Sequence, residues 1–151
     1  MMHGYIEKDW GTNFPESYLW CQANTFKRID TSFFLSIADI PFKRFNFKGF
    51  ICIFLVDKKE YRFTTYNLAR IKNVEVNKNA NKISILIKKN MYKLYVNIKR
   101  GDSVELIAPN SDGMRKVINE SIGSEISIKL LKGKKILFEG SSANAGLEIV
   151  G

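Results

Sequence analysis

The residues best suited to chemistry are crowded into the first eighteen positions, outside any regular strand pattern. Two carboxyl groups, Glu7 and Asp9, flank Lys8, and the aromatic residues Tyr5 and Trp10 lie on either side of this short charged stretch. A carboxylic acid in apolar surroundings stays protonated to higher pH, because desolvation raises its pKa. The segment could therefore present a proton donor to an apolar ligand, or its charges could simply form an ion-pair network.

Other common chemistries lack the residues that they need. His3 is the only histidine, so a Ser-His-Asp triad or a histidine-rich metal site would have to be built around a near-terminal residue. Cys21 and Cys52 are widely separated and lack the spacing of a zinc site, and no Gly-rich phosphate loop occurs. We therefore expect neither a metal nor a nucleotide cofactor.

The elements that must position these groups are short β-strands. Apolar or alternating runs recur about every eight to twelve residues, which is typical of an all-β sandwich or barrel. The expected strands are residues 19–26, 32–40, 49–56, 61–66, 71–76, 83–87, 92–98, 104–108, 115–119, 126–131, 136–138 and 147–150. Turn-forming residues separate them, among them Gly123-Ser124 and Lys132-Gly133.

Alternation within these runs predicts one apolar face and one wet face. Ile83, Ile85 and Ile87 interleave with Ser84 and Lys88, so we expect the isoleucines to point inward. Runs joined by short turns form antiparallel neighbours, and closing such a sheet removes exposed edges. The sequence therefore predicts an all-β, antiparallel barrel or closed sandwich with an apolar interior and little helix.

Length and composition fit one globular domain. The chain has 151 residues, of which 45% are hydrophobic and 13% aromatic, so a real core is expected. Both cysteines lie inside apolar runs, which favours buried free thiols in a reducing compartment. No run approaches the roughly 20 apolar residues of a spanning helix, and the start lacks a signal-peptide pattern. We expect a soluble, cytoplasmic protein.

The net charge of +9 raises the question of an anionic partner. The basic residues are spread over strand faces and turns: Lys72, Lys78, Lys82, Lys88, Lys89, Lys93, Lys99 and Arg100. This distribution favours a solvated barrel exterior over a dense nucleic-acid or membrane patch, and the aromatic residues are poorly interleaved with it. We expect no specific nucleic-acid partner, while peripheral membrane contact remains open.

Several segments together resemble a known family. They are the run Gly4-Tyr5-Ile6-Glu7-Lys8-Asp9-Trp10-Gly11, the pair Phe14-Pro15, and the segments 20–24, 35–41 and 145–148. This pattern resembles the tocopherol cyclase family, whose members look like two lipocalin-like β domains in tandem. The chain is similar to their carboxy-terminal half, which implies that an amino-terminal domain of the same protein is missing here.

The resemblance implies cyclisation of a prenylated quinol into a chromanol, an isomerase reaction of the intramolecular lyase type. A carboxylic acid must protonate an alkene in a shielded pocket, and Glu7 and Asp9 are the candidates. Tyr5, Trp10 and Trp20 would line the pocket and stabilise the cation with their π faces. The other expected contacts with the quinol head group come from Lys8, Gln22 and Asn24.

Structural interpretations of the same residues stay open. Glu7, Lys8 and Asp9 could pair at the barrel mouth while the tryptophans fill the core, and Gln22 and Asn24 could lie on an outward strand face. Ser36 and Asp39, near Pro41, suit a strand-end turn. The alternative function is a non-catalytic carrier of a lipid or isoprenoid, because small barrels commonly hold one apolar ligand.

Overall fold

The computed structural model describes residues 6, 15, 17–42, 45–110 and 113–151. Within these ranges the chain forms β1 (Tyr18–Ala23), β2 (Ser32–Phe42), β3 (Phe45–Val56), β4 (Lys59–Thr64), β5 (Arg70–Asn77), β6 (Lys82–Lys89), β7 (Tyr92–Lys99), β8 (Val104–Asn110), β9 (Gly113–Lys132) and β10 (Lys135–Val150). One turn of 3-10 helix, η1 (Thr65–Asn67), connects β4 to β5. The strand pairs are antiparallel. The predicted all-β antiparallel fold with little helix is therefore confirmed.

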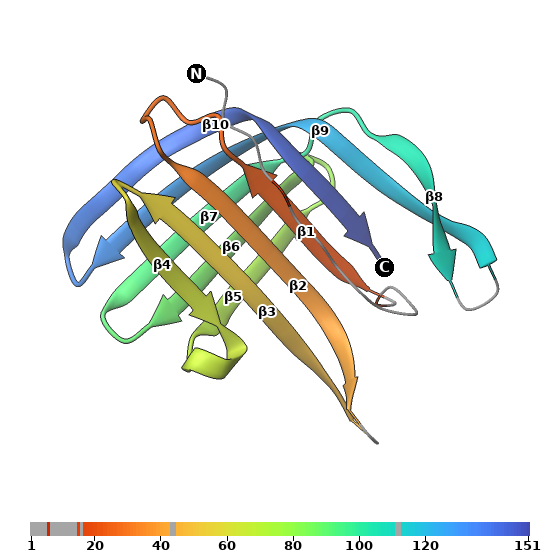
Figure 1. The fold of residues 1–151 in the computed structure, drawn as a ribbon, viewed down its shortest axis with the longest axis horizontal. Helices are drawn as coiled ribbons and strands as arrows, with labels where there is room; N and C mark the ends of the chain where they lie inside the picture. The colour runs from red at the N-terminus through yellow and green to blue at the C-terminus, as the bar shows by residue number, and fades with distance from the viewer. Residues whose placement is uncertain (1–5, 7–14, 16, 43–44, 111–112) are drawn as a thin grey trace.

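The strands belong to a single sheet that curls into a nearly closed barrel (Figure 1). Their order is β4-β3-β2-β1-β10-β9-β7-β6-β5, and β8 pairs with β9 outside this path. β1 to β4 form one wall, and β5 to β7 lie behind them as the opposite wall (Figure 1). The end strands β4 and β5 are joined through η1, and no backbone pairing between them occurs among the described residues.

The prediction was wrong about the two longest strands. β9 and β10 were each expected as two short strands, with a turn at Gly123-Ser124 inside the region that β9 occupies. The turn signal is overridden because β9 is paired along almost its whole length: β10 lies on one edge, while β8 and then β7 follow each other along the other. The β9–β10 ladder continues on both sides of Gly123 with a register shift between Ser121 and Ser124, so the glycine marks an irregularity in one long strand and not a turn.

Gly123 lies at a close crossing of two segments of the chain. The connection from β7 to β8 passes so near to β9 that a Cβ atom on Gly101 would lie 2.5 Å from the carbonyl oxygen of Gly123. Beside this crossing, the buried Ser124 hydroxyl donates to Ser121 Oγ at 3.0 Å and accepts the Gly101 N–H at 3.3 Å. Gly101 is therefore required by the approach of two backbones.

One end of the barrel interior is packed solid with aromatic rings. Phe26, Phe33, Phe54 and Phe138 meet edge to face, and the rings of Phe54 and Phe138 are closest, with centroids 4.9 Å apart. On the opposite wall, Ile83, Ile85 and Ile87 of β6 are all buried, which confirms the predicted alternation of inward and outward residues in this strand. This aromatic plug closes the barrel at the end where β2 begins and β3 finishes.

Candidate functional site

Most of the predicted site residues lie outside the part of the chain that the structure describes. Tyr5, Glu7, Lys8, Asp9 and Trp10 all belong to this group. Their expected roles as acids, cation-stabilising rings and head-group contacts stay predictions.

Trp20 and Gln22 lie on the outer face of β1. The core side of this strand is formed by Leu19, Cys21 and Ala23, so the alternate residues point away from the interior. The Trp20 ring meets Phe34 edge to face with centroids 6.3 Å apart. The buried Nε2 atom of Gln22 has no hydrogen-bond partner among the described residues.

The three family-like segments of the described chain come together around Trp20. In the sheet, Trp20 is paired with Ser36 of β2 on one side and with Glu148 of β10 on the other. Gly146 provides room for the indole, because a Cβ atom there would lie 3.1 Å from Trp20 Cζ3. Sequence segments more than a hundred residues apart therefore form one continuous surface patch on β2, β1 and β10.

Tyr18 and Glu148 form a hydrogen-bonded pair beside this patch. The Tyr18 hydroxyl donates to Glu148 Oε2 at 3.0 Å, and the tyrosine is 9% exposed. Burial is the largest cause that raises the pKa of Tyr18 well above its usual value, and the nearby carboxylate and its hydrogen bond add to the effect. Tyr18 is therefore a neutral hydrogen-bond donor at physiological pH.

Asn24, the third described residue of the predicted site, follows directly after β1 and is half-buried.

The barrel end opposite the aromatic plug contains an open hollow of about 540 Å³. Its apolar walls come from opposite sides of the curled sheet: Leu19, Ile37, Phe50 and Ile149 on one side, and Ala69, Ile71 and Val74 on the other. Val74 faces inward, since it is paired with the buried Ile85. Its side chain is nevertheless 46% exposed. The interior is therefore filled at one end and accessible at the other.

Charged side chains stand around the apolar hollow. Asp39 and Lys48 are opposite each other on β2 and β3, and Arg70 begins β5 across the gap. The strand-end turn expected at Ser36 and Asp39 is wrong, because β2 continues to Phe42 and is paired with β3 throughout. Among the described residues, the hollow thus combines apolar walls with the carboxylate of Asp39 and the cations of Lys48 and Arg70.

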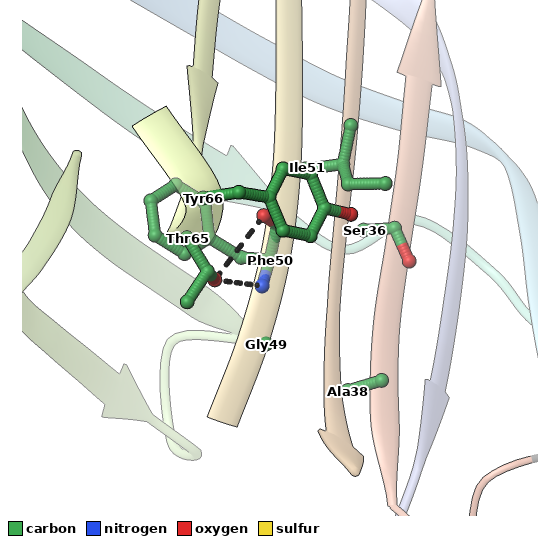
Figure 2. Close-up of a pocket in the computed structure, with 7 residues that line it drawn as sticks. All are labelled: Ser36, Ala38, Gly49, Phe50, Ile51, Thr65 and Tyr66. Carbon is green, nitrogen blue, oxygen red and sulfur yellow. Dashed lines mark hydrogen bonds between the residues drawn. The ribbon is translucent and has the colours of Figure 1, made fainter. Parts of the chain in front are cut away.

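A second, smaller recess of about 250 Å³ lies outside the barrel wall. Figure 2 shows the Tyr66 ring extending over β3 toward Ser36, above the small residues Gly49 and Ala38. The preceding Thr65 holds this segment in place, since its hydroxyl accepts the Phe50 N–H at 2.9 Å and donates to the Phe50 carbonyl at 3.5 Å (Figure 2). Thr65 also lines the main hollow, so η1 is part of both surfaces.

The residues that line the hollow carry no signal in the sequence that predicts them. Leu19, Ile37 and Phe50 are ordinary inward residues of alternating strands, and no polar motif marks them. Only the register that places them at one level, beyond the aromatic plug, shows that they surround a space. They could have been found only by noticing that no large side chain faces them across the barrel. Recognising this requires the strand pairing to be known.

The described residues include two buried thiols and no cluster of metal ligands. Cys21 and Cys52 are free and buried, as predicted. No cluster of three or more metal-ligating side chains occurs among the described residues. In the same part of the chain, no helix is long and apolar enough to cross a membrane.

Fold and site together define a small antiparallel β-barrel with an accessible apolar hollow at one end. The chain matches the model of the family described as Tocopherol cyclase-like over residues 2–151. It therefore belongs to the tocopherol cyclase-like family, and the resemblance seen in its sequence is confirmed. The comparisons with curated proteins and with solved structures gave no match.

Proposed function

We propose that this protein binds an elongated isoprenoid of the prenylated quinol class in the hollow and cyclises it. The observation that carries the proposal is the hollow itself, whose walls are apolar and whose surroundings include Asp39, Lys48 and Arg70. Its volume of about 540 Å³ lies within the range of roughly 300–1,000 Å³ that is usual for small-molecule sites. The family match supports the choice of an isoprenoid over other apolar ligands.

The polarity of the hollow suits an amphiphile with a compact polar head. Val74 and Ile71 provide an apolar wall along β5, while Arg70 precedes them at the start of the strand. A prenyl chain would cover the exposed valine, and the quinol hydroxyls would meet the charged side chains. Burial of the chain supplies the affinity, and the polar contacts fix its direction.

The proposed reaction is a cyclisation in which no atom is gained or lost. A carboxyl group donates its proton to the less substituted alkene carbon, and a tertiary cation forms on the neighbouring carbon. The phenol oxygen bonds to that cation, and the phenol proton returns to the carboxylate. Asp39 is the carboxyl group that the described residues bring to the hollow, while Glu7 and Asp9 stay the candidates from the sequence.

The first test places a bulky ring in the hollow. Val74→Trp should weaken the binding of a prenylated hydroquinone at least about tenfold, because the indole would occupy the space that the ligand needs. Val76→Trp is the matched control, since Val76 is on the same face of β5, is 60% exposed and does not line the hollow. Displacement of a fluorescent apolar probe measures both. Equal affinity of the two variants would exclude the hollow as the binding site.

A second assay, with the same hydroquinone, decides whether the protein is a catalyst or a carrier. Chromanol formed from the hydroquinone is measured by mass spectrometry for the wild type and for Asp39→Asn, Glu7→Gln and Asp9→Asn. We expect one carboxyl variant to keep its affinity and to lose product formation, which would identify the acid. If the wild type binds the hydroquinone and forms no chromanol, the protein is a carrier and the cyclisation is disproved.

A further inference from the structure

We propose that the end of the molecule that carries the β6–β7 and β9–β10 turns docks on the surface of an anionic membrane. The surface consists of the hairpin turn between β6 and β7, the turn between β9 and β10, and the adjoining parts of β4 and η1. The two turns lie side by side at one end of the molecule (Figure 1), and the Gly133 N–H donates to the Met91 carbonyl oxygen at 2.8 Å. This inference concerns the outer surface and does not depend on what fills the hollow.

Six lysines and one arginine from separate strands are gathered at this end. We define the basic rim as the side chains Lys59, Arg62, Lys88, Lys89, Lys93, Lys132 and Lys135. Lys89 Nζ donates to the Arg62 carbonyl oxygen at 3.1 Å, which connects the β6–β7 turn to β4. In the sheet, Lys88 is paired with Lys93, and Lys132 with Lys135. Like charges are thus placed next to one another on neighbouring strands, an arrangement that an anionic surface would relieve.

Aromatic rings hold the cations of the basic rim together. The Tyr61 and Tyr92 rings meet edge to face with centroids 5.8 Å apart. Lys59 Nζ lies 5.1 Å from the Tyr61 ring, and Lys132 Nζ lies 5.9 Å from the Tyr92 ring. Because the rings attract these ammonium groups, the charges are held near one another.

The nearby carboxylates are already paired. Glu60 Oε1 is 2.8 Å from Arg62 Nη2, and Asp57 Oδ2 in the β3–β4 turn is 2.6 Å from Arg28 Nη2. The lysines of the basic rim therefore retain an excess of positive charge.

Apolar side chains project from the same end into solvent. Leu68 is 81% exposed and Met91 is 62% exposed. Leu68 comes shortly before the start of β5, and Met91 comes shortly after the end of β6. Because Arg70 is paired with Lys88, these two strand ends lie side by side and bring the two apolar residues to the same end of the sheet. Leu68 also has a left-handed backbone with a φ of 65°, which bulky residues rarely adopt. The backbone is thus held in a costly conformation with the leucine exposed.

The loop that carries Leu68 is fixed by hydrogen bonds. Asn67 accepts the Thr64 N–H at 3.0 Å, and its own amide donates to the Arg62 carbonyl oxygen at 2.9 Å. A rigid loop loses little conformational freedom when its apolar tip enters a lipid headgroup layer. Cations surrounding exposed apolar side chains are the combination that anionic bilayers attract, whereas nucleic acid would need the cations alone.

Vesicle sedimentation tests the proposal with the full chain and no added ligand. The wild type should bind vesicles that contain about 30% phosphatidylserine, bind neutral phosphatidylcholine vesicles much more weakly, and dissociate when salt rises to about 0.5 M. The double variant Lys89→Glu, Lys132→Glu should bind at least about thirtyfold more weakly. Leu68→Ser should weaken binding about fivefold at unchanged charge.

The control makes the same change in net charge at the opposite end of β6. Lys78→Glu with Lys82→Glu alters two exposed lysines at the β5–β6 turn, away from the basic rim, and should keep wild-type vesicle affinity. Circular dichroism checks that each variant is folded. The proposal is overturned if both double variants lose affinity equally, if neutral vesicles bind as well as anionic ones, or if duplex nucleic acid binds more tightly than the vesicles. Failure here would leave the hollow and its ligand untouched.

Discussion

The buried thiols show how the surroundings of a residue determine its chemistry. Cys21 and Cys52 lie on β1 and β3, on either side of the buried Leu35 of β2. Burial raises the pKa of Cys21 to about 12 and that of Cys52 well above its usual value, with a smaller contribution to Cys52 from Cys21. Thiolates are the reactive form of cysteine, so both groups are inert packing residues at neutral pH.

Raised thiol pKa values predict a loss of stability at alkaline pH. Below pH 9.0, the usual thiol pKa, both the folded and the unfolded chain hold these protons. Above it the unfolded chain releases them first, so stability falls as pH rises, by about 1.4 kcal/mol per pH unit for each thiol. Tyr18 adds a loss of the same sign above pH 10.0, its own usual value. Urea unfolding at about pH 8 and pH 10 should therefore show a loss of about 3 kcal/mol from the thiols.

The variant Cys21→Ala, Cys52→Ala provides the comparison for this pH effect. It should be less stable at neutral pH, because two buried sulfurs are lost, but its stability should fall much less between the two pH values. If the wild type and the double variant show the same alkaline slope, the thiols do not account for the loss.

At the scale of the element, Gly101 and Gly123 lie in close contact but differ in whether a side chain would fit there. Gly101 faces the backbone of Gly123, whereas a Cβ atom on Gly123 itself would have no neighbour within 4 Å. Contact with a backbone atom cannot be relieved by turning a side chain, so the whole β7–β8 connection would have to move. Only one of the two glycines is therefore needed for space.

This difference predicts unequal effects of the same substitution. Gly101→Ala should destabilise the protein by about 1–3 kcal/mol, because the connection must shift away from β9. Gly123→Ala should be neutral or should stabilise by up to about 1 kcal/mol, because alanine loses less backbone entropy in a strand. The two free energies of unfolding from urea titrations give the answer. Equal losses in both variants would contradict the close crossing.

Alternation predicted the individual strands far better than it predicted their boundaries or their contacts. Ile83, Ile85 and Ile87 are buried as expected, because an inward face depends only on local periodicity. The break predicted at Gly123 is only a register shift, because the pairing of β9 with β10 on both sides of it is a long-range effect. Trp20 points outward because it alternates with Leu19 and Cys21, but its neighbours Ser36 and Glu148 are set by strand pairing, which the sequence does not specify. The hollow could not be predicted for the same reason.

At the scale of the whole molecule, the two ends of the barrel differ in what they contain. The aromatic plug fills the end where β3 finishes, and the hollow occupies the end where Phe50 and Lys48 of the same strand face inward. Packed rings contribute stability through their contacts, whereas an open hollow gives up that stability and provides a surface for a ligand. The fold therefore separates the part that holds the barrel together from the part available for binding.

This separation can be measured with one substitution at two positions of β3. Phe54 is fully buried and contacts three other phenylalanine rings, so Phe54→Ala should cost about 3–5 kcal/mol of unfolding free energy. Phe50 also faces inward and is nearly buried, but one side of it borders the hollow. Phe50→Ala should therefore cost less, about 1–3 kcal/mol, because fewer packed neighbours are lost, and it should change ligand affinity. Urea unfolding gives both energies and probe displacement gives the affinities. A larger loss at Phe50 than at Phe54, or a ligand effect confined to Phe54, would show that the plug and the hollow have been assigned to the wrong ends.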